Sequence, residues 1–359
     1  MPALTSARVK ARAAELGFDL CGVAPVGDHA ELGFLREWLH RGYAGEMAWL
    51  ADSVDLRADV RALLPAARSV IVTGSLYNTI PASGDVPPAP GDARIARYAL
   101  GDDYHDVLRA RINALVDGMH AESPDPLETR AFVDSAPVQE RVYALYAGLG
   151  WVGKNTCIIN PEVGSWFFLA VVICSLPLEP DTQGLDGCGT CTRCIDACPT
   201  GALVEPYVLD ARRCLSYLTI EHRSVVPEPL RVPMGAHIYG CDICQAVCPY
   251  NGAPLLSQDA HWRARPGLDS PSLAELWLRT DDELHALVKG TALTRARLIG
   301  LRRNLAIAIG NAGDPDAVAA LCTPNDDRPS AEDPMVREHV EWALDQQRRR
   351  REAPPHGSV

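Results

Sequence analysis

The sequence predicts a mixed α/β protein in three parts, and three observations support this fold class. Strand-like apolar runs alternate with helical segments over residues 1–180, which is typical of helices layered on a sheet. Eight of the twelve cysteines fall between positions 188 and 248. Short helical segments then follow one another toward the C-terminus. We therefore expect an α/β or α+β domain at 1–180, a ferredoxin-like domain at 181–255 and an all-α domain at 256–359.

The first region contains the clearest alternation of helix and strand patterns. Residues 31–43 (ELGFLREWLHRGY) and roughly 103–118 have helical spacing of their apolar positions. Residues 69–77 (SVIVTGSLY) and 167–176 (FFLAVVICSL) are continuous apolar runs of the length of buried strands. Such runs predict a sheet covered by helices.

Four cysteines in the middle region follow the spacing C-x2-C-x2-C-x3-C, and Pro199 comes directly after the last. They are Cys188, Cys191, Cys194 and Cys198. This is the bacterial ferredoxin run, in which three cysteines hold one [4Fe–4S] cluster and the fourth reaches over to a second. The region has little apolar periodicity, so we expect it to be organised around metal rather than around a hydrophobic core.

A second run repeats the end of this motif without its first ligand, and Cys214, 27 residues upstream of Cys241, is the substitute. The ferredoxin crossover then gives two ligand sets. Cluster one takes Cys188, Cys191, Cys194 and Cys248, and cluster two takes Cys198, Cys214, Cys241 and Cys244. A four-cysteine zinc site is the alternative, but zinc does not call for a third cysteine at x2 and a fourth before proline, twice over.

The other four cysteines, Cys21, Cys157, Cys174 and Cys322, lie in apolar or helical surroundings. We expect them to be small buried side chains. Cys157 is left open, because it follows a glycine-bearing loop.

The last region reads as successive short helices over residues 272–346, two of which begin at Asp-Pro. Residues 301–321 (LRRNLAIAIGNAGDPDAVAAL) resemble a HEAT-type helical repeat. An ordinary helical bundle is the alternative.

Composition limits the function classes that need to be considered. The net charge of −12 excludes a protein that depends on bulk attraction to polyanions, so a nucleic-acid partner requires a local basic patch. The longest apolar run, 166–178, falls short of the ~20 residues of a membrane span. The first residues lack the continuous apolar stretch of an export signal. We expect a cytoplasmic protein without membrane contact, in which reduced thiols bind metal.

Several further segments carry a resemblance to a known family. They are RYALGDDYH (97–105), VDSAPVQER (133–141), GLGWVGKN (148–155), RCLSYLTIEHR (213–223) and GCDICQAVCPYN (240–251). Together with the cysteine runs they resemble epoxyqueuosine reductases over nearly the whole chain. The resemblance implies an enzyme that uses cobalamin and two [4Fe–4S] clusters to reduce the epoxide of epoxyqueuosine in tRNA, giving queuosine at the wobble position. It also implies a nitroreductase-like fold for the cobalamin domain. The chain lacks a DxHxxG cobalamin signature, so no histidine is expected to ligate cobalt.

The resemblance implies that Asp134 is the proton donor of this reaction. Converting an epoxide to an alkene takes two electrons and two protons and releases water, so the leaving oxygen needs an acid. A carboxyl group in an apolar, water-poor pocket keeps its proton near neutral pH. Without the resemblance, Asp134 before Ser135-Ala-Pro would be interpreted as a turn or cap residue.

Seven further residues are expected to touch the cobalamin. An arginine fork suits the amide or phosphate groups of this cofactor, and apolar strand residues suit the corrin face. The residues are Arg57, Arg97, Asn155, Ile158, Leu169, Ser216 and Asp242. Surface ion pairs and plain core packing are the alternatives. Ser216 and Asp242 lie next to cluster-two ligands in the sequence, which predicts that the cofactor lies beside that cluster.

Basic residues near the clusters and in the helical region are the expected tRNA contacts. They are His222, Arg223, Arg231, Arg295, Arg302 and Arg303. Phosphates require such cations, and a solvated helix face is the alternative. Asp102 and Asp106 replace residues that are commonly basic in the family, whereas Asp103, Tyr104 and His105 are kept.

The resemblance also implies an external electron donor such as a flavodoxin or ferredoxin. Two other functions share part of these features. A corrinoid reductive dehalogenase uses the same cofactors, and a non-catalytic electron-transfer subunit would need only the clusters.

Overall fold

A four-stranded antiparallel sheet forms the centre of the N-terminal half in the computed structural model, which describes residues 4–80, 89, 91–324 and 326–352. Its strand order is β1 (Leu20–Pro25), β2 (Ser69–Leu76), β7 (Phe167–Cys174) and β4 (Thr129–Phe132). β2 and β7 pair over their full length, and nearly every residue of both is buried. The two apolar runs predicted as strands are thus confirmed, and both faces of the sheet must be covered.

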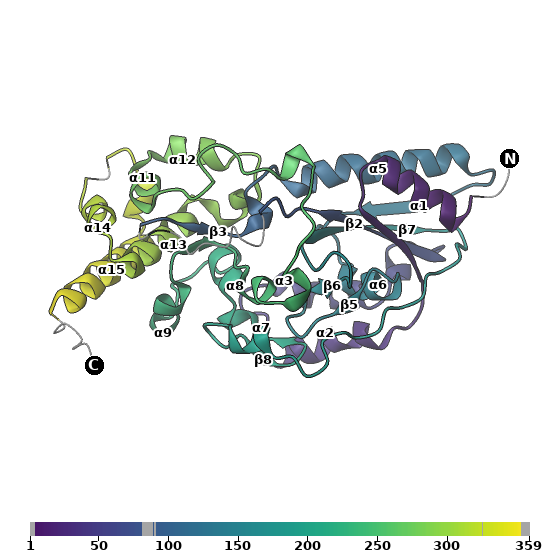
Figure 1. The fold of residues 1–359 in the computed structure, drawn as a ribbon, viewed down its shortest axis with the longest axis horizontal. Helices are drawn as coiled ribbons and strands as arrows, with labels where there is room; N and C mark the ends of the chain where they lie inside the picture. Colours follow the sequence, from purple (N-terminus) through teal and green to yellow (C-terminus); the bar gives the residue numbers. More distant parts are fainter. Residues whose placement is uncertain (1–3, 81–88, 90, 325, 353–359) are drawn as a thin grey trace.

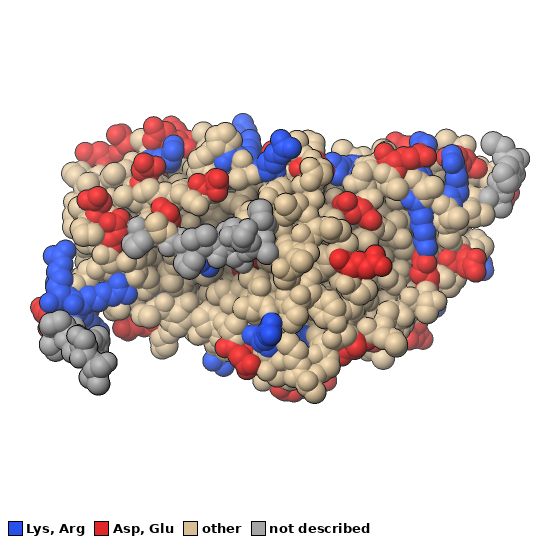
Figure 2. Space-filling model, viewed as in Figure 1, with Lys and Arg blue, Asp and Glu red and all other residues tan. Residues whose placement is uncertain are grey.

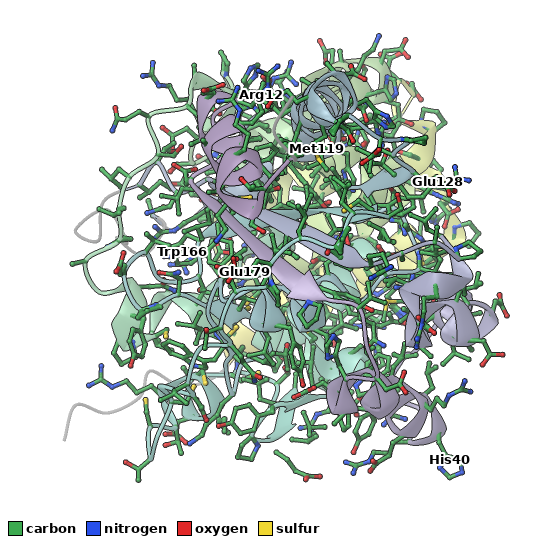
Figure 3. All side chains as sticks on the ribbon, turned by 90° about the vertical axis from the view of Figure 1, so that its right-hand side faces the viewer. Arg12, His40, Met119, Glu128, Trp166 and Glu179 are labelled. Atoms are coloured by element: carbon green, nitrogen blue, oxygen red, sulfur yellow. The ribbon has the colours of Figure 1, made fainter. Side chains whose placement is uncertain are left out.

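Helices cover the two faces of the sheet (Figure 1). On one face, α1 (Ser6–Glu15) and α5 (Tyr104–Glu122) pack on Ala170 and Val172 of β7. On the other, α6 (Glu140–Tyr146) packs on Val171 and Ile173, together with Leu32 of α2 (Ala30–His40). Successive β7 residues therefore serve opposite cores, as the two-residue period of a strand requires. Figure 3, which views the molecule end-on, shows α1 with Arg12 and α5 with Met119 above the sheet.

Short elements make up the segment that carries the cysteines. Cys194 lies in the one-turn helix α7 (Arg193–Asp196), and Cys244 lies in its counterpart α10 (Ile243–Ala246). α8 (Leu215–Ile220) begins directly after Cys214. Among the described residues before 240, the other short α-helices and strands are α3 (Ala48–Asp52), α4 (Val54–Ala58), β3 (Arg94–Ile95), β5 (Trp151–Val152), β6 (Ile158–Ile159), β8 (Leu203–Glu205), β9 (Val208–Leu209), α9 (Glu228–Arg231) and β10 (His237–Tyr239).

Helices form the C-terminal part of the described chain, as the sequence predicts. They are α11 (Leu273–Leu278), α12 (Asp281–Val288), α13 (Arg297–Ala312), α14 (Pro315–Leu321) and α15 (Pro334–Glu352). α13 is the central one, because every residue from 300 to 310 is buried. Two Asp-Pro helix starts are confirmed at α14, where Asp314 caps the helix, and at α15. The likeness to a HEAT repeat stays a prediction.

A segment of the N-terminal half is part of the C-terminal core. β3 pairs in parallel with β10, and Ala93, Ala99 and Leu100 belong to the same apolar cluster as α11 to α15. In Figure 1, β3 accordingly lies among the green and yellow helices. The Asp103 N–H, at the start of α5, donates to the Gly290 carbonyl at 2.9 Å. The two ends of the molecule are therefore joined by backbone hydrogen bonds as well as by the chain.

The surface carries both charge signs. Acidic and basic side chains are interspersed over the face shown in Figure 2, with cations gathered where α15 ends. Among the described residues, no helix combines the length and the apolar character that crossing a bilayer requires.

Candidate active site

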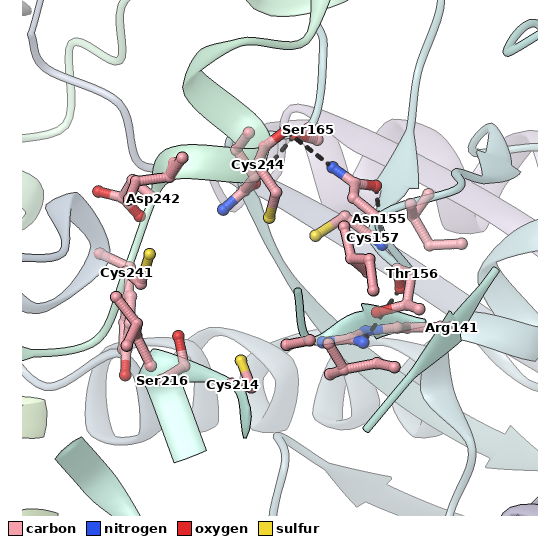
Figure 4. A pocket seen from close by; sticks show the side chains of 18 of the residues that line it. Arg141, Asn155, Thr156, Cys157, Ser165, Cys214, Ser216, Cys241, Asp242 and Cys244 are labelled. Atoms are coloured by element: carbon pink, nitrogen blue, oxygen red, sulfur yellow. Dashed lines mark hydrogen bonds between the residues drawn. The ribbon is translucent and has the colours of Figure 1, made fainter. Parts of the chain in front are cut away.

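A cavity of about 420 Å³ lies between the sheet and the cysteine segments. One wall comes from the residues around β6 and the start of β7, including Ile158, Phe168 and Leu169. The opposite wall comes from α8 and α10 with the cysteines beside them (Figure 4). Of the predicted cofactor contacts and the proton donor, the cavity is lined by Asp134, Asn155, Ile158, Leu169, Ser216 and Asp242.

The eight predicted cluster ligands divide between two cavities. Cys198, Cys214, Cys241 and Cys244 line the large cavity. The other four, Cys188, Cys191, Cys194 and Cys248, line a second cavity of about 230 Å³. This division is the one that the ferredoxin crossover predicts. Among the described residues, no three Cys, His, Asp or Glu side chains converge as ligands of a single metal ion. The thiols instead surround volumes, an arrangement that suits a cubane cluster.

Hydrogen bonds from other side chains hold the backbone around these cysteines. Lys154, which is buried, donates from Nζ to the carbonyls of Gly189 at 2.6 Å and Cys191 at 3.0 Å. Gly189 has φ of 46°, a left-handed conformation that glycine adopts without cost. Donors also face two sulfurs: the Ala202 N–H lies 3.2 Å from Cys198 Sγ, and the Trp151 ring N–H lies 3.5 Å from Cys188 Sγ. Hydrogen bonds of this kind stabilise thiolates that bind metal.

Asp134 follows β4 at the rim of the large cavity, and a tyrosine holds its carboxylate. The Tyr104 hydroxyl donates to Asp134 Oδ2 at 2.7 Å. Burial, with the charge of Asp134 as the next cause, keeps the pKa of Tyr104 well above its ordinary value, so the hydroxyl remains a donor. The Asp134 side chain is 66% exposed. The water-poor surroundings expected for it are therefore not provided by the protein around it.

Glu140, six residues further on, is the acid that the sequence analysis missed. Its Oε1 accepts the backbone N–H of Asp134 at 2.9 Å, and the side chain lines the same cavity. Burial and then the charge of Asp134 raise the pKa of Glu140 to about 8. This carboxyl, rather than Asp134, has the low-polarity environment that retains a proton near neutral pH. Glu140 lies in the segment VDSAPVQER, which was the available signal.

The polar wall of the cavity is fixed by contacts among the predicted residues. Asn155 donates to the Cys244 carbonyl at 3.3 Å and accepts the Cys157 N–H at 3.2 Å. Asp242 Oδ2 accepts the backbone N–H of Arg97 at 2.7 Å. Cys157 itself lines the cavity beside Cys244 (Figure 4), so its position is not a plain core site.

The two predicted arginines lie behind the cavity rather than at its wall. Arg97 is buried, its guanidinium donates to Asn78 Oδ1 at 2.8 Å, and it lies over the Trp166 ring. Arg57 on α4 stacks on Trp49, with its carbon Cζ 5.1 Å from the ring centroid. Its charge nevertheless acts on Asp134 and Glu140. Arg97 therefore supports the wall, and Arg57 contributes a positive field near the acids.

Three predicted tRNA contacts are wrong because the side chains are buried. Arg302 and Arg303 are fully buried in the core around α13. Arg302 donates to the Trp277 and Arg279 carbonyls, and Arg303 donates to the Leu218 carbonyl. Arg231 is also buried and pairs with Glu338, with Nη2 to Oε1 at 2.7 Å. None of the three guanidinium groups is available to a phosphate.

The remaining predicted cations lie together with one that was not predicted. Arg223 donates to the carbonyls of Arg295 at 2.8 Å and Ala296 at 3.1 Å. Burial lowers the pKa of Arg223, and the nearby charges of Arg297 and Arg295 lower it further. The charge of Arg295, which pairs with Glu221, also acts on Asp134. We call Arg223, Arg295 and Arg297 the arginine patch. His222 is mostly buried beside Glu46.

One cysteine expectation is also wrong. Cys322 is exposed rather than buried. It is the C-cap residue of α14.

Comparison with known proteins gives two family models. The model described as "4Fe-4S double cluster binding domain" matches residues 187–251. The model described as "Epoxyqueuosine reductase QueG, DUF1730" matches residues 57–135. The first match contains all eight predicted cluster ligands, and the second ends just after Asp134.

Curated relatives match over nearly the full chain. An epoxyqueuosine reductase of Xanthomonas campestris is 42% identical over 96% of this chain and 97% of its own length. One of Gloeobacter violaceus is 44% identical over 88% and 99%, and one of Escherichia coli is 40% identical over 96% and 90%.

Solved structures are similar in fold as well. An epoxyqueuosine reductase crystallised with an epoxyqueuosine-modified tRNA-Tyr stem loop has a TM-score of 0.85 at 30% identity, covering 95% of this chain and 89% of that one. The Bacillus subtilis enzyme, solved with its aspartate catalytic loop swung out of the active site, has a TM-score of 0.83 at 28% identity, covering 95% and 90%.

Proposed function

The chain belongs to the epoxyqueuosine reductase family, and from this premise we propose that it reduces epoxyqueuosine in tRNA to queuosine at the wobble position. One observation on the residues of this chain supports the proposal. Asp134 lines a cavity that is also lined by the four cysteines predicted for cluster two. An acid and a source of electrons therefore face the same space, as reduction of an epoxide requires.

The residues at the cavity fit the cofactor set of the family. Phe168, Ile158 and Leu169 offer an apolar surface to a flat macrocycle, and Asn155, Ser216 and Asp242 offer polar groups to its amides. Cobalamin bound there would supply electrons to the epoxide carbons, and the two [4Fe–4S] clusters would deliver these electrons singly. An external flavodoxin or ferredoxin is the proposed donor.

The chain's own residues supply the acid and its placement. Asp134 gives a proton to the epoxide oxygen as the carbon–oxygen bond breaks, which lowers the barrier to its departure. The Tyr104 hydroxyl donates to one oxygen of the Asp134 side chain, and the Glu140 side chain accepts the Asp134 backbone N–H. These contacts fix Asp134 at the cavity although its side chain is largely exposed.

For tRNA binding we propose the arginine patch in place of the buried arginines. The modified base must leave the anticodon stack to reach the cavity, at a cost of a few kcal/mol. Phosphate contacts on the flanking backbone offset that cost. The electrostatic interaction between Arg295 and Asp134 supports a patch near the cavity.

The proposal extends to domain organisation and location. We propose a nitroreductase-like cobalamin domain at 1–180, a ferredoxin-like domain at 181–255 and a HEAT-like domain at 256–359. The tRNA substrate suits a cytoplasmic protein.

Metal analysis tests the cofactor set. Protein purified and reconstituted without oxygen should contain about eight irons, four in each of the two clusters, and one cobalt. Zinc in place of iron, or four irons, would contradict the two-cluster assignment. Iron without cobalt would instead favour an electron-transfer subunit.

Replacement of Asp134 tests the chemistry. Asp134→Asn should keep iron and cobalt but lose most turnover of epoxyqueuosine tRNA, by about 100-fold or more, because an amide does not donate the required proton. Asp106→Asn is the matched control, since Asp106 is exposed on α5 and pairs only with Arg109 in the described ion pairs. A wild-type rate for Asp134→Asn would remove Asp134 from the role of acid.

A further inference from the structure

The proposed reaction needs more protons than one carboxyl holds. An epoxide that becomes an alkene breaks two carbon–oxygen bonds, takes up two electrons and two protons, and releases one water. The electrons come from the external donor through the cofactors of the proposed function. Asp134 delivers one proton and is then a carboxylate. A second group must return a proton to it before the oxygen can leave as water.

A histidine at the start of α5 faces Asp134, and an aspartate contacts the other side of its ring. The His105 Nε2 lies 3.9 Å from Asp134 Oδ2. On the other side of the ring, His105 Nδ1 lies 2.8 Å from Asp103 Oδ1. Asp103 also caps α5 by accepting the backbone N–H of His105 at 3.0 Å. The three side chains thus form a line from the helix start to the cavity rim.

The Asp103 contact decides which ring nitrogen is free to exchange a proton. A carboxylate at Nδ1 accepts a hydrogen bond, so Nδ1 keeps its proton in both charge states of the ring. The hydrogen bond from His105 is the main reason why the pKa of Asp103 lies below its ordinary value, so Asp103 stays charged. Nε2 is then the site that gains and loses a proton, and it is the nitrogen that faces Asp134.

We propose that His105, oriented by Asp103, returns a proton to Asp134 and so provides the second proton of the reduction. The inference rests on the proposed function. The imidazolium gives its Nε2 proton to Asp134 Oδ2 and becomes neutral imidazole. The ring, whose side chain is 32% exposed, takes a new proton from water at Nε2. His105 acts through Asp134, so it is a positioning and relay residue.

Charged groups from several elements surround this line of side chains. Asp103 and Asp134 flank the ring, and Tyr104 stacks on it with ring centroids 4.0 Å apart. Glu140, Arg57 and Arg295 act on Asp134 from the other elements at the rim. Arg109 acts on Asp103 from within α5.

Kinetics of His105→Gln test the proposal. We expect kcat to fall about 10- to 100-fold with KM for tRNA and the metal content unchanged. Wild-type kcat should also fall as pH rises and the imidazolium is lost, whereas the kcat of His105→Gln should lack this limb. In His105→Ala, added imidazole should restore turnover severalfold.

Two further variants make the test specific. His261→Gln is the matched control, because His261 forms a similar pair with Asp102, Nδ1 to Oδ2 at 2.7 Å, and within the described residues it forms no hydrogen bond or ion pair with Asp134. It should keep the wild-type pH profile. Asp103→Asn should lower kcat severalfold while retaining the helix cap, since asparagine caps as well as aspartate.

The outcomes separate the relay from the function. A slow His105→Gln enzyme that keeps the alkaline limb and gains nothing from imidazole would mean a structural role and overturn the relay. Unchanged kcat would overturn it as well. Failure of the wild-type protein to reduce epoxyqueuosine tRNA would instead overturn the proposed function.

Discussion

At the scale of single residues, the conformation of Asp134 depends on its neighbour Glu140. Asp134 has φ of 50°, in the left-handed region that few residues other than glycine adopt. The backbone N–H in this conformation points to Glu140 Oε1 at 2.9 Å. The partly buried Glu140 carboxyl group therefore holds the backbone of Asp134, the proposed proton donor.

This arrangement predicts a pH-dependent stability. The pKa of Glu140 is raised to about 8 in the folded protein. The folded state therefore binds a proton that the unfolded state releases above its ordinary carboxyl pKa, so stability falls as pH rises from about 4.5 to 8. Glu140→Gln keeps the acceptor oxygen and removes this cost. It should raise the free energy of unfolding at pH 9 by about 2–4 kcal/mol relative to wild type, and by less at pH 6. Melting temperatures at both pH values check this, and an equal gain at both would contradict it.

Sequence reasoning succeeded at residues whose chemistry is fixed by spacing. The cysteine runs divide between two cavities as the ferredoxin spacing implies, and the match to a 4Fe-4S double cluster binding domain supports iron–sulfur clusters in this segment. The assignment of each cysteine to a cluster stays a prediction. It failed for Arg302 and Arg303, where a basic pair in a helix suggested a phosphate site. Burial depends on how many neighbours surround a helix, and one helix's own periodicity does not contain that information.

At the scale of elements, α13 holds the cluster segments in place. Arg303 donates to the Leu218 carbonyl in the last turn of α8, and Asn304 donates to the Thr219 carbonyl at 2.8 Å. Carbonyls at a helix end have no partner within the helix. α8 begins at Cys214, so α13 fixes the element that carries a predicted cluster-two ligand.

Arg303→Met should therefore weaken iron binding at cluster two, although Arg303 is not one of its predicted ligands. The change leaves buried carbonyls without donors, at about 1–3 kcal/mol each. We expect a melting temperature lower by several degrees and partial loss of the iron of cluster two. Arg297→Met is the control, because Arg297 is exposed at the start of the same helix. Equal stability of the two variants would contradict the supporting role of Arg303.

The crossover between the cysteine runs makes a second prediction at this scale. Cys198 follows α7 but lines the cavity of Cys214, Cys241 and Cys244. Cys198→Ala should thus perturb the electron paramagnetic resonance signal of cluster two and spare that of cluster one. Cys194→Ala, one turn away in the same run, should do the reverse. The same spectrum from both variants would refute the pairing.

At the scale of the whole molecule, the tRNA surface has to be local, because the chain has a net charge of −12. Arg223→Gln with Arg297→Gln should weaken tRNA binding and reduce its log–log salt slope by about one unit per lost contact. Arg8→Gln with Arg36→Gln removes the same charge from exposed positions elsewhere and is the control. Titrations with tRNA at two salt concentrations decide the matter, and an unchanged slope would exclude the arginine patch.

The sequence predicted the kind of secondary structure in each region but not the contacts between the regions. The strands at 69–77 and 167–176 follow from apolar runs whose pattern is local. The pairing of β3 with β10 was not foreseen, because two- and three-residue strands leave no periodic signal. The position of Asp134 in the same cavity as four of the cysteines likewise depends on contacts between distant segments.

The interlocking has a consequence for how the chain is made. The ribosome releases β3 and the start of α5 long before β10 and Gly290, which hold them. At a synthesis rate of about 5–20 residues per second, the Gly290 carbonyl is made roughly ten seconds or more after Asp103 and His105. Until then the nascent chain contains all four strands of the sheet, but the start of α5 lacks its hydrogen bond to Gly290. A product that stops before residue 290 is thus expected to be inactive even with every cysteine present, and its exposed apolar residues, such as Ala99 and Leu100, offer a binding site to chaperones.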